Sequence, residues 1–357
     1  MIEKIDVRIG KIIRVFPSAK IKIIVETPSD PKSLEKLVES AGGQYLHNAL
    51  KYIAVKIQAG LIKNLVKDPR ITKIWYVDSR IFEPYVGALG SVEWLLGRKD
   101  KVGAVNFSLA PPIEKPGTQP FDPNEPFNVA TKKLFEAGFV PVVAAGNAGA
   151  LGNDTLNPWS VAPWVIGVGA TTIDGKKLAD FSSRGIPGDP LYKPTVVGPG
   201  VDIVVPHPPE IKKTPEQIEK DRQFLSEDQM SSHTVVTGTS FAAANISGGI
   251  SNIMSYLSNN FGPKMSEDVT WYHFDPRKIE VKYRFGNYDK TIRFEANSNS
   301  LLPSRIKELI IQMAMPMPGY EPHEVGAGFM NRAVTETVFG KNKVELGGTN
   351  ILRDEPW

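Results

Sequence analysis

The stretch 237–249, which reads TGTSFAAANISGG, contains residue types that suit nucleophilic chemistry. Gly238 permits a sharp turn, and Thr239 can cap a helix that continues through Tyr256. Ser240 would then lie at the helix N-terminus, where free N–H groups and the helix dipole favour developing negative charge. A nucleophilic serine whose own N–H helps to form an oxyanion hole has this geometry. A buried helix with an ordinary Ser/Thr cap fits the same residues.

The elements that must position Ser240 precede it in the chain. Apolar segments that favour strands alternate with helical segments: strands are expected at 101–110, 140–147, 164–169 and 201–205, and helices at 91–96 and 127–137. This alternation predicts a parallel α/β sheet with helices on both faces. Ligands bind such sheets at the carboxyl ends of the strands, where we expect Ala110, Asn147 and Ser240.

Residues 1–85 have a different pattern. Strands are expected at 21–26, 44–47, 52–57 and 71–77, with helices at 31–40 and 59–67. The order βαββαβ predicts a small ferredoxin-like α+β domain. We expect it to end in an extended, proline-containing tail at 80–85.

Composition limits the classes of function. The chain is 41% hydrophobic and 23% charged, as in an ordinary globular protein, and its formal net charge is only +3. That balance gives no indication of a nucleic-acid partner, and no apolar run is long enough to span a membrane. The chain has no cysteine, which excludes disulfides and thiolate metal sites. Its start lacks the apolar region of a secretory signal, so we expect a cytoplasmic or particle-associated protein, or a mature secreted form.

Several sequence blocks resemble the subtilisin-like serine proteases, or subtilases, and they follow one another in that family's order. The blocks are 144–147 (AAGN), 157–159 (NPW), 165–170 (VIGVGA), 181–185 (FSSRG), 193–203 (KPTVVGPGVDI), 238–240 (GTS) and 326–331 (GAGFMN). The N-terminal domain likewise resembles the inhibitor-like propeptide of these enzymes. The resemblance covers most of the chain.

This resemblance implies a role for particular residues. Ser240 matches the nucleophile, and Asn147 matches the side-chain donor of the oxyanion hole. Two segments match those that flank a substrate in extended, strand-like pairing, Ser108-Leu109-Ala110 and Ala144-Ala145-Gly146. The expected partner is therefore a protein or peptide in an extended conformation. We expect no cofactor and no metal; the family allows Ca²⁺, but no motif here supports it.

Two blocks of the family pattern are absent. The chain has neither the Asp-Thr/Ser-Gly motif nor the His-Gly-Thr-His motif that supply the other catalytic residues. A serine without a base is a weak nucleophile. None of the remaining histidines has a spacing that makes it an obvious replacement: His47, His207, His233, His273 and His323.

These departures favour a catalytically impaired pseudoprotease that acts as a binding, regulatory or structural component. The alternative is an active serine endopeptidase that uses Ser240 with a base from a partner chain or from a histidine outside the family pattern. The absent blocks also supply sheet strands, so the sheet should be truncated in its N-terminal half. Its strand near 102–106 would keep an open edge, which a homo- or hetero-oligomer is expected to cover.

The expected organisation has three parts. Residues 1–85 form the propeptide-like domain, residues 86–340 form the subtilisin-like domain with insertions at 207–233 and 262–304, and residues 341–357 form a tail. The first insertion should contain a helix at 215–224. The second should contain a hairpin of 279–285 and 291–295, because Gly286-Asn287 is a good turn signal, before a helix at 304–313.

Overall fold

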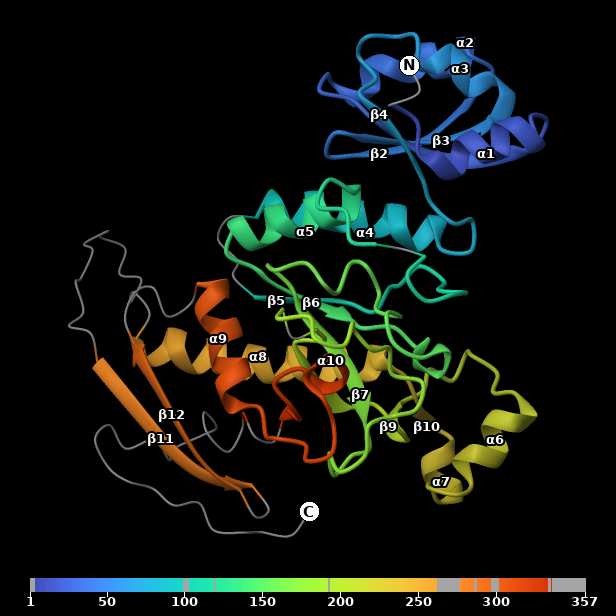
Figure 1. Ribbon diagram of the computed structural model, residues 1–357. Coiled ribbons are helices and arrows are strands. Elements are labelled where there is room, and N and C mark those ends of the chain that lie inside the picture. Colours follow the sequence, from blue (N-terminus) through green and yellow to red (C-terminus); the bar gives the residue numbers. More distant parts are fainter. Residues whose placement is uncertain are drawn as a thin grey trace. The chain divides into compact units, whose positions relative to one another are not determined.

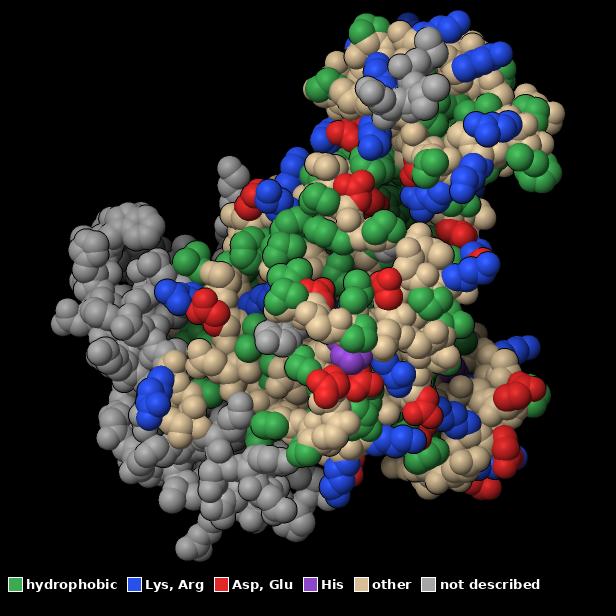
Figure 2. Space-filling model, in the orientation of Figure 1, with side chains coloured by type: hydrophobic (Ala, Val, Ile, Leu, Met, Phe, Trp, Pro, Cys, Tyr) green, Lys and Arg blue, Asp and Glu red, His purple; other side chains and the backbone are tan. Residues whose placement is uncertain are grey.

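A computed structural model describes residues 4–98, 103–118, 120–191, 193–261, 277–285, 288–296, 302–332 and 335 (Figure 1). The chain divides into two compact units. Unit 1 comprises Met1–Lys101 and Asp122–Ala137, and unit 2 comprises Val102–Phe121 and Gly138–Trp357. Among the described residues, no helix combines the length and apolar character needed to cross a membrane. Basic and acidic side chains are interspersed on the face that Figure 2 shows, as the balanced net charge predicts.

Unit 1 contains the expected ferredoxin-like sheet. Its strands are β1 (Lys20–Glu26), β2 (Gln44–Ala49), β3 (Tyr52–Gln58) and β4 (Lys73–Tyr76), in the order β2-β3-β1-β4 with antiparallel pairing. The intervening helical segments are η2 (Pro31–Leu34), α2 (Glu35–Ser40), η3 (Ala59–Leu61) and α3 (Ile62–Leu65). Ile23, Ile53 and Ile74 are fully buried in the core that the sheet shares with these helices.

Helix α1 (Val7–Val15) has no counterpart among the expected elements. Its N-cap is Asp6, whose carboxylate accepts a hydrogen bond from Arg8 N at 2.9 Å. Ile9 is fully buried in the core of unit 1, with Ile5 and Ile13 packed against it. Burial of this single apolar stripe, rather than helix propensity, explains the element.

Helix α4 (Phe82–Leu96) begins earlier than the sequence indicated. The prediction of an extended tail at 80–85 was wrong from residue 82 onward, because Phe82 to Tyr85 form the first helical turn. Pro84 is tolerated there, since the N–H groups of a first turn have no intrahelical acceptor. The expected boundary after Tyr85 therefore falls inside α4.

Helix α5 (Pro126–Glu136) packs beside α4 within unit 1. Glu125 caps α5 and accepts hydrogen bonds from Phe127 N at 2.9 Å and Asn128 N at 3.1 Å. The hydroxyl of Tyr85 on α4 donates to the other oxygen of Glu125. One carboxylate thus holds two helices together.

Unit 2 is built on a parallel sheet in the order β5-β6-β7-β8. Its strands are β5 (Ala104–Phe107), β6 (Val140–Ala144), β7 (Ile166–Thr171) and β8 (Val196–Pro199). Every residue of β6, β7 and β8 is buried. Strand β5 pairs only with β6 among the described strands, so the expected edge is present.

Helix α8 (Thr239–Phe261) runs across all four of these strands, as Figure 1 shows, and α9 (Pro303–Met313) packs on α8. Ala242, Ile246 and Ile250 face the sheet and are buried. Met313, Met315 and Met317 are also buried in this core, in agreement with a packing role. The predicted parallel α/β class is confirmed. The unit also contains the short helices η4 (Gly149–Leu151) and α10 (Pro322–Val325).

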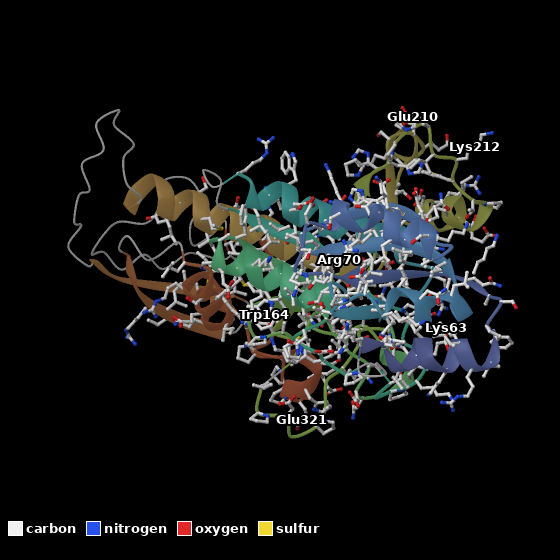
Figure 3. All side chains as sticks on the ribbon, turned by 90° about the horizontal axis from the view of Figure 1, so that it is seen from above. Lys63, Arg70, Trp164, Glu210, Lys212 and Glu321 are labelled. Atoms are coloured by element: carbon white, nitrogen blue, oxygen red, sulfur yellow. The ribbon has the colours of Figure 1, made fainter. Side chains whose placement is uncertain are left out.

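The expected fourth strand at 201–205 was assigned to the wrong sheet. Strand β8 takes that place, and β9 (Ile203–Pro206) pairs antiparallel with β10 (His233–Val236). The first insertion lies between β9 and β10 and contains α6 (Pro215–Asp221) and α7 (Glu227–Met230). Its outer loop carries the exposed residues Glu210 and Lys212, labelled in Figure 3.

The predicted hairpin of the second insertion is confirmed. Strand β11 (Arg277–Phe285) pairs antiparallel with β12 (Tyr288–Ala296), and Phe285 lies opposite Tyr288. The turn residues Gly286 and Asn287, His273 and the tail 341–357 lie outside the described residues.

Candidate functional site

Ser240 lies in the first turn of α8, directly after the turn that leaves β10. Gly238 N donates to the carbonyl oxygen of Gly200 at 2.8 Å, which ties this turn to the loop after β8. The side chain of Ser240 is half-buried. The position at a helix N-terminus agrees with the sequence prediction.

Asn147 rather than Thr239 caps this helix. The side-chain oxygen of Asn147 accepts hydrogen bonds from Thr239 N at 3.0 Å and from Thr239 Oγ1 at 2.9 Å. The threonine hydroxyl, predicted to cap α8, instead accepts from Gly146 N at 3.2 Å. Because its oxygen is fixed in this way, the amide of Asn147 has one orientation. Its Nδ2 donates to no group among the described residues.

Ser108 is joined to the same place. Its hydroxyl donates to the carbonyl oxygen of Ser240 at 3.1 Å and accepts from Asn106 Nδ2 at 3.0 Å. Ser108 directly follows β5, and Asn147 follows β6 after a short turn. The carboxyl ends of two neighbouring strands and the start of α8 therefore converge, as expected for a parallel sheet.

The backbone at Ser108 and Ala110 continues the free edge of β5. The carbonyl of Gly103 accepts a hydrogen bond from Val140 N at 3.0 Å, so the backbone polar groups of residue 103 point toward β6. In a strand, the backbone polar groups of successive residues point alternately to its two sides. Leu109 faces the same way, and its carbonyl accepts from Asn157 Nδ2 at 2.9 Å. Ser108 and Ala110 thus point to the opposite side. Their backbone N–H and C=O groups make no hydrogen bond with any described residue.

The segment Ala144-Ala145-Gly146 differs in this respect. The N–H of Ala145 donates to Val168 O and its carbonyl accepts from Asn157 N, each at 2.8 Å. The carbonyl of Gly146 accepts from Ser183 N at 3.0 Å. These backbone groups of Ala145 and Gly146 already have partners within the protein, unlike those of Ser108 and Ala110 among the described residues.

Asn157 is a residue whose importance the sequence did not reveal, although it stands in the NPW block. It is fully buried, and its Nδ2 donates to both Leu109 O at 2.9 Å and Ala144 O at 2.8 Å. Its own side-chain oxygen accepts from Trp159 N at 3.1 Å. One amide therefore joins the two segments that were expected to flank a substrate.

No base accepts a hydrogen bond from Ser240 in the part of the chain that the structure describes. The Ser240 hydroxyl makes no hydrogen bond there. His207 Nε2 contacts Ile211 O at 2.7 Å, and His233 Nδ1 contacts Ser232 Oγ at 2.9 Å. Asp202 is the first acidic residue after β8 in the sequence. Its carboxylate accepts from Lys220 at 3.0 Å and from Thr237 Oγ1 at 3.2 Å. The described residues also hold no cluster of three His, Cys, Asp or Glu side chains that could bind a metal ion.

Comparison with known proteins supplies a family. The family model described as "Subtilase family" matches residues 85–287, more than half of the chain. The chain is also similar to solved structures, among them the following three. A mutant of the protease domain of PatA is 19% identical over 71% of this chain and 64% of that one, with a TM-score of 0.42. The prenylagaramide maturation protease PagA is 17% identical over 71% and 68%, with a TM-score of 0.43. The PatG macrocyclase in complex with peptide is 18% identical over 71% and 58%, with a TM-score of 0.44.

Proposed function

Because this chain belongs to the subtilase family, we propose that it is a pseudoprotease that binds an extended protein segment beside Ser240 and hydrolyses it poorly or not at all. The observation that carries this proposal is the unassisted Ser240 hydroxyl. No described side chain accepts its proton, and the sequence lacks the two family blocks that would do so. In subtilisin, loss of the triad histidine alone lowers turnover by roughly 10⁶-fold.

The binding part of the proposal rests on backbone chemistry. Ser108 and Ala110 present two N–H donors and two carbonyl acceptors toward one side, in the register of a strand edge. An extended peptide satisfies such groups by adding a strand, and side-chain pockets then give specificity. Asn147 Nδ2 provides a further donor at the adjacent helix N-terminus.

A binding experiment tests this part. Fluorescence anisotropy of the full chain with a library of extended peptides should identify binders. N-methylation of the peptide amides that pair with Ser108 or Ala110 should weaken binding by about 1 kcal/mol for each lost hydrogen bond. N-methylation elsewhere in the same peptide is the matched control. Equal affinity for all methylated forms would contradict strand addition.

The second candidate function is a serine endopeptidase whose base comes from a partner chain or from a histidine outside the family pattern. It is favoured by the orientation of Asn147, whose free donor lies beside a serine at a helix N-terminus, as an oxyanion hole requires. The Ser240→Ala variant separates the two candidates. Any peptidase activity of the native assembly that this variant retains does not belong to Ser240.

The open edge of β5 supports a further part of the proposal, an oligomeric or structural role. A partner strand that covers Ala104 to Ala110 would bury both the edge and the candidate site. A monodisperse monomer by light scattering at high concentration would argue against this role.

A further inference from the structure

Helix α6 of the first insertion lies beside β10, the strand that leads to Gly238 and Ser240 (Figure 1). Two of its side chains bind the backbone of Val235. Asp221 Oδ1 accepts from the N–H at 2.8 Å, and Gln217 Nε2 donates to the carbonyl at 2.9 Å. These side chains take the place of a neighbouring strand along the edge of β10 that faces away from β9. The insertion is therefore attached to the strand that delivers Ser240.

A third side chain of α6 extends this attachment past the end of the strand. Lys220 Nζ donates to Thr237 Oγ1 and lies next to Asp202 Oδ1, each at 3.0 Å. The threonine hydroxyl also donates to Asp202 Oδ1 at 3.2 Å and accepts from Asp202 N at 3.0 Å. A hydroxyl has one donor and two acceptor positions, so all three are occupied and the rotamer of Thr237 is fixed.

Asp202 depends on these contacts because of its backbone conformation. Its φ is +55°, in the left-handed region that is unfavourable for residues with a side chain, although Asp enters it more readily than most. Two residues earlier, the carbonyl of Gly200 accepts from Gly238 N at 2.8 Å. Residues 200–202 and 237–238 are thus joined by hydrogen bonds, and Lys220 contacts both sides of this joint.

The joint lies next to the candidate oxyanion site. Thr239 directly follows Gly238, and its N–H and hydroxyl both donate to Asn147 Oδ1, at 3.0 and 2.9 Å. A shift of the turn at 237–238 therefore moves Thr239, and with it the Asn147 amide. A contact from the insertion can in this way alter the groups beside Ser240 without touching them.

We propose that Lys220 is a positioning residue for the peptide site, and that it acts through Thr237 on the turn before Ser240. This inference rests on the proposed binding of an extended segment at that site. The side chains of Lys220 and Asp202 are 33% and 35% exposed, so their ion pair adds little to the stability of the whole fold. Loss of Lys220 should therefore leave the protein folded and loosen the turn.

Hydrogen exchange of the full chain without peptide measures the turn directly. Lys220→Met should speed exchange of the Gly238 and Thr239 amides about fivefold, because the turn loses an ion pair and a hydrogen bond. The Val235 amide, which Asp221 holds, should change less than about twofold. Lys220→Arg keeps a charged donor and should restore slow exchange in the turn.

Peptide affinity is the second readout. Lys220→Met should weaken binding about fivefold, and Lys220→Arg should restore it. Arg222→Met is the matched control, since it removes the same charge from the insertion but at a side chain that pairs with Glu219. It should change neither readout. Asp202→Asn removes the same ion pair and should reproduce both effects of Lys220→Met, so it replaces that variant if it does not fold.

Three results would overturn the positioning role. They are unchanged exchange at Gly238 and Thr239 in Lys220→Met, an equal change in Arg222→Met, and lack of rescue by Lys220→Arg. If the unaltered protein binds no extended peptide, the proposed function fails instead, and the exchange rates still decide the role of Lys220. If peptide binds the unaltered protein and Lys220→Met equally well, the proposed function stands and the positioning role fails.

Discussion

Thr239 gives both its backbone N–H and its hydroxyl to the side-chain oxygen of Asn147, at 3.0 and 2.9 Å. This pair of bonds joins the start of α8 to the turn after β6. It fixes the orientation of the Asn147 amide before any ligand binds, which is the preorganisation that an oxyanion site requires. The same amide therefore has a structural role through its oxygen and a proposed binding role through its nitrogen.

The two roles of Asn147 can be separated by substitution. Asn147→Asp keeps an oxygen that accepts from Thr239 but loses the donor, so it should fold with nearly unchanged stability and bind peptide more weakly. Asn147→Ala loses both and should in addition be destabilised by about 1 kcal/mol, the usual cost of a lost cap. Urea unfolding and peptide anisotropy measure the two effects. Equal stability losses in both variants would show that the oxygen does not act as the cap.

Asn157 should control the geometry of the peptide site. In Asn157→Asp a carboxylate faces the carbonyl oxygens of Leu109 and Ala144 and can donate to neither, so each loses a buried partner. Such losses cost about 1–3 kcal/mol each, and we expect peptide affinity to fall more than tenfold. Asn124→Asp, on an exposed loop, is the matched control. Undiminished peptide affinity in a folded Asn157→Asp protein would exclude a positioning role.

Unit 1 should lose stability as pH rises from 4.5 to about 7. Burial, partly offset by hydrogen bonds from Tyr85, Asn128 and Phe127 and by the charge of Arg8, raises the pKa of Glu125 from 4.5 to about 7. The folded unit therefore binds more protons than the unfolded chain across this range, and its stability falls as pH increases. The buried hydroxyl of Tyr52 has no hydrogen-bond partner among the described residues, and burial, followed by the charges of Glu26 and Glu125, raises its pKa.

Hydrogen exchange at the first turn of α5 measures this effect. Protection of Phe127 and Asn128 amides should decrease between pH 5 and 7 after correction for intrinsic exchange, and Glu125→Gln should abolish the trend. Glu136→Gln, at the exposed end of the same helix, is the control. If Glu125→Gln leaves the pH dependence of this protection unaltered, a group other than Glu125 causes it.

The stability of the first insertion should depend on the buried ion pair between Lys213 and Asp221. Lys213 Nζ lies 2.6 Å from Asp221 Oδ2 and also donates to Met230 O at 2.7 Å. Asp221 is fully buried, and its other oxygen accepts from Gln217, Thr234 and Val235. These partners outweigh desolvation and hold its pKa at about 2, so the stability they provide is lost only as pH falls from 3.8 through about 2.

Removal of the Lys213 side chain leaves the charge of the buried Asp221 carboxylate uncompensated. Lys213→Met should destabilise the insertion by about 3–5 kcal/mol, whereas Lys213→Met combined with Asp221→Leu should recover part of the loss. Thermal unfolding of the single and double variants measures the coupling. Additive losses would mean that the two side chains act independently.

The parallel sheet, α8, the hairpin and the ferredoxin-like sheet were predictable, because each depends on local periodicity and turn signals. Helix α1 and the early start of α4 were not, because tertiary burial of Ile9 and Phe82 decides both. The position of β9 was misjudged since a short apolar segment has the same pattern in either sheet.

The site was predictable to a similar degree. Sequence blocks indicated Ser240, Asn147 and Ser108, which the structure brings together. They could not reveal that Asn157 joins two backbone segments 48 and 13 residues away along the chain, because no local pattern encodes such contacts. Nor could they show that Ala145 and Gly146 already have hydrogen-bond partners.

The reactivity of Ser240 tests the central claim most directly. The full chain, in its native assembly, is treated with a fluorophosphonate probe beside an active serine hydrolase, with Ser240→Ala as control. We predict labelling of Ser240 at least roughly 10³-fold slower than that of the active enzyme, because no side chain among the described residues accepts the serine proton. Labelling of Ser240 at a rate typical of active serine hydrolases, and absent in Ser240→Ala, would contradict the account.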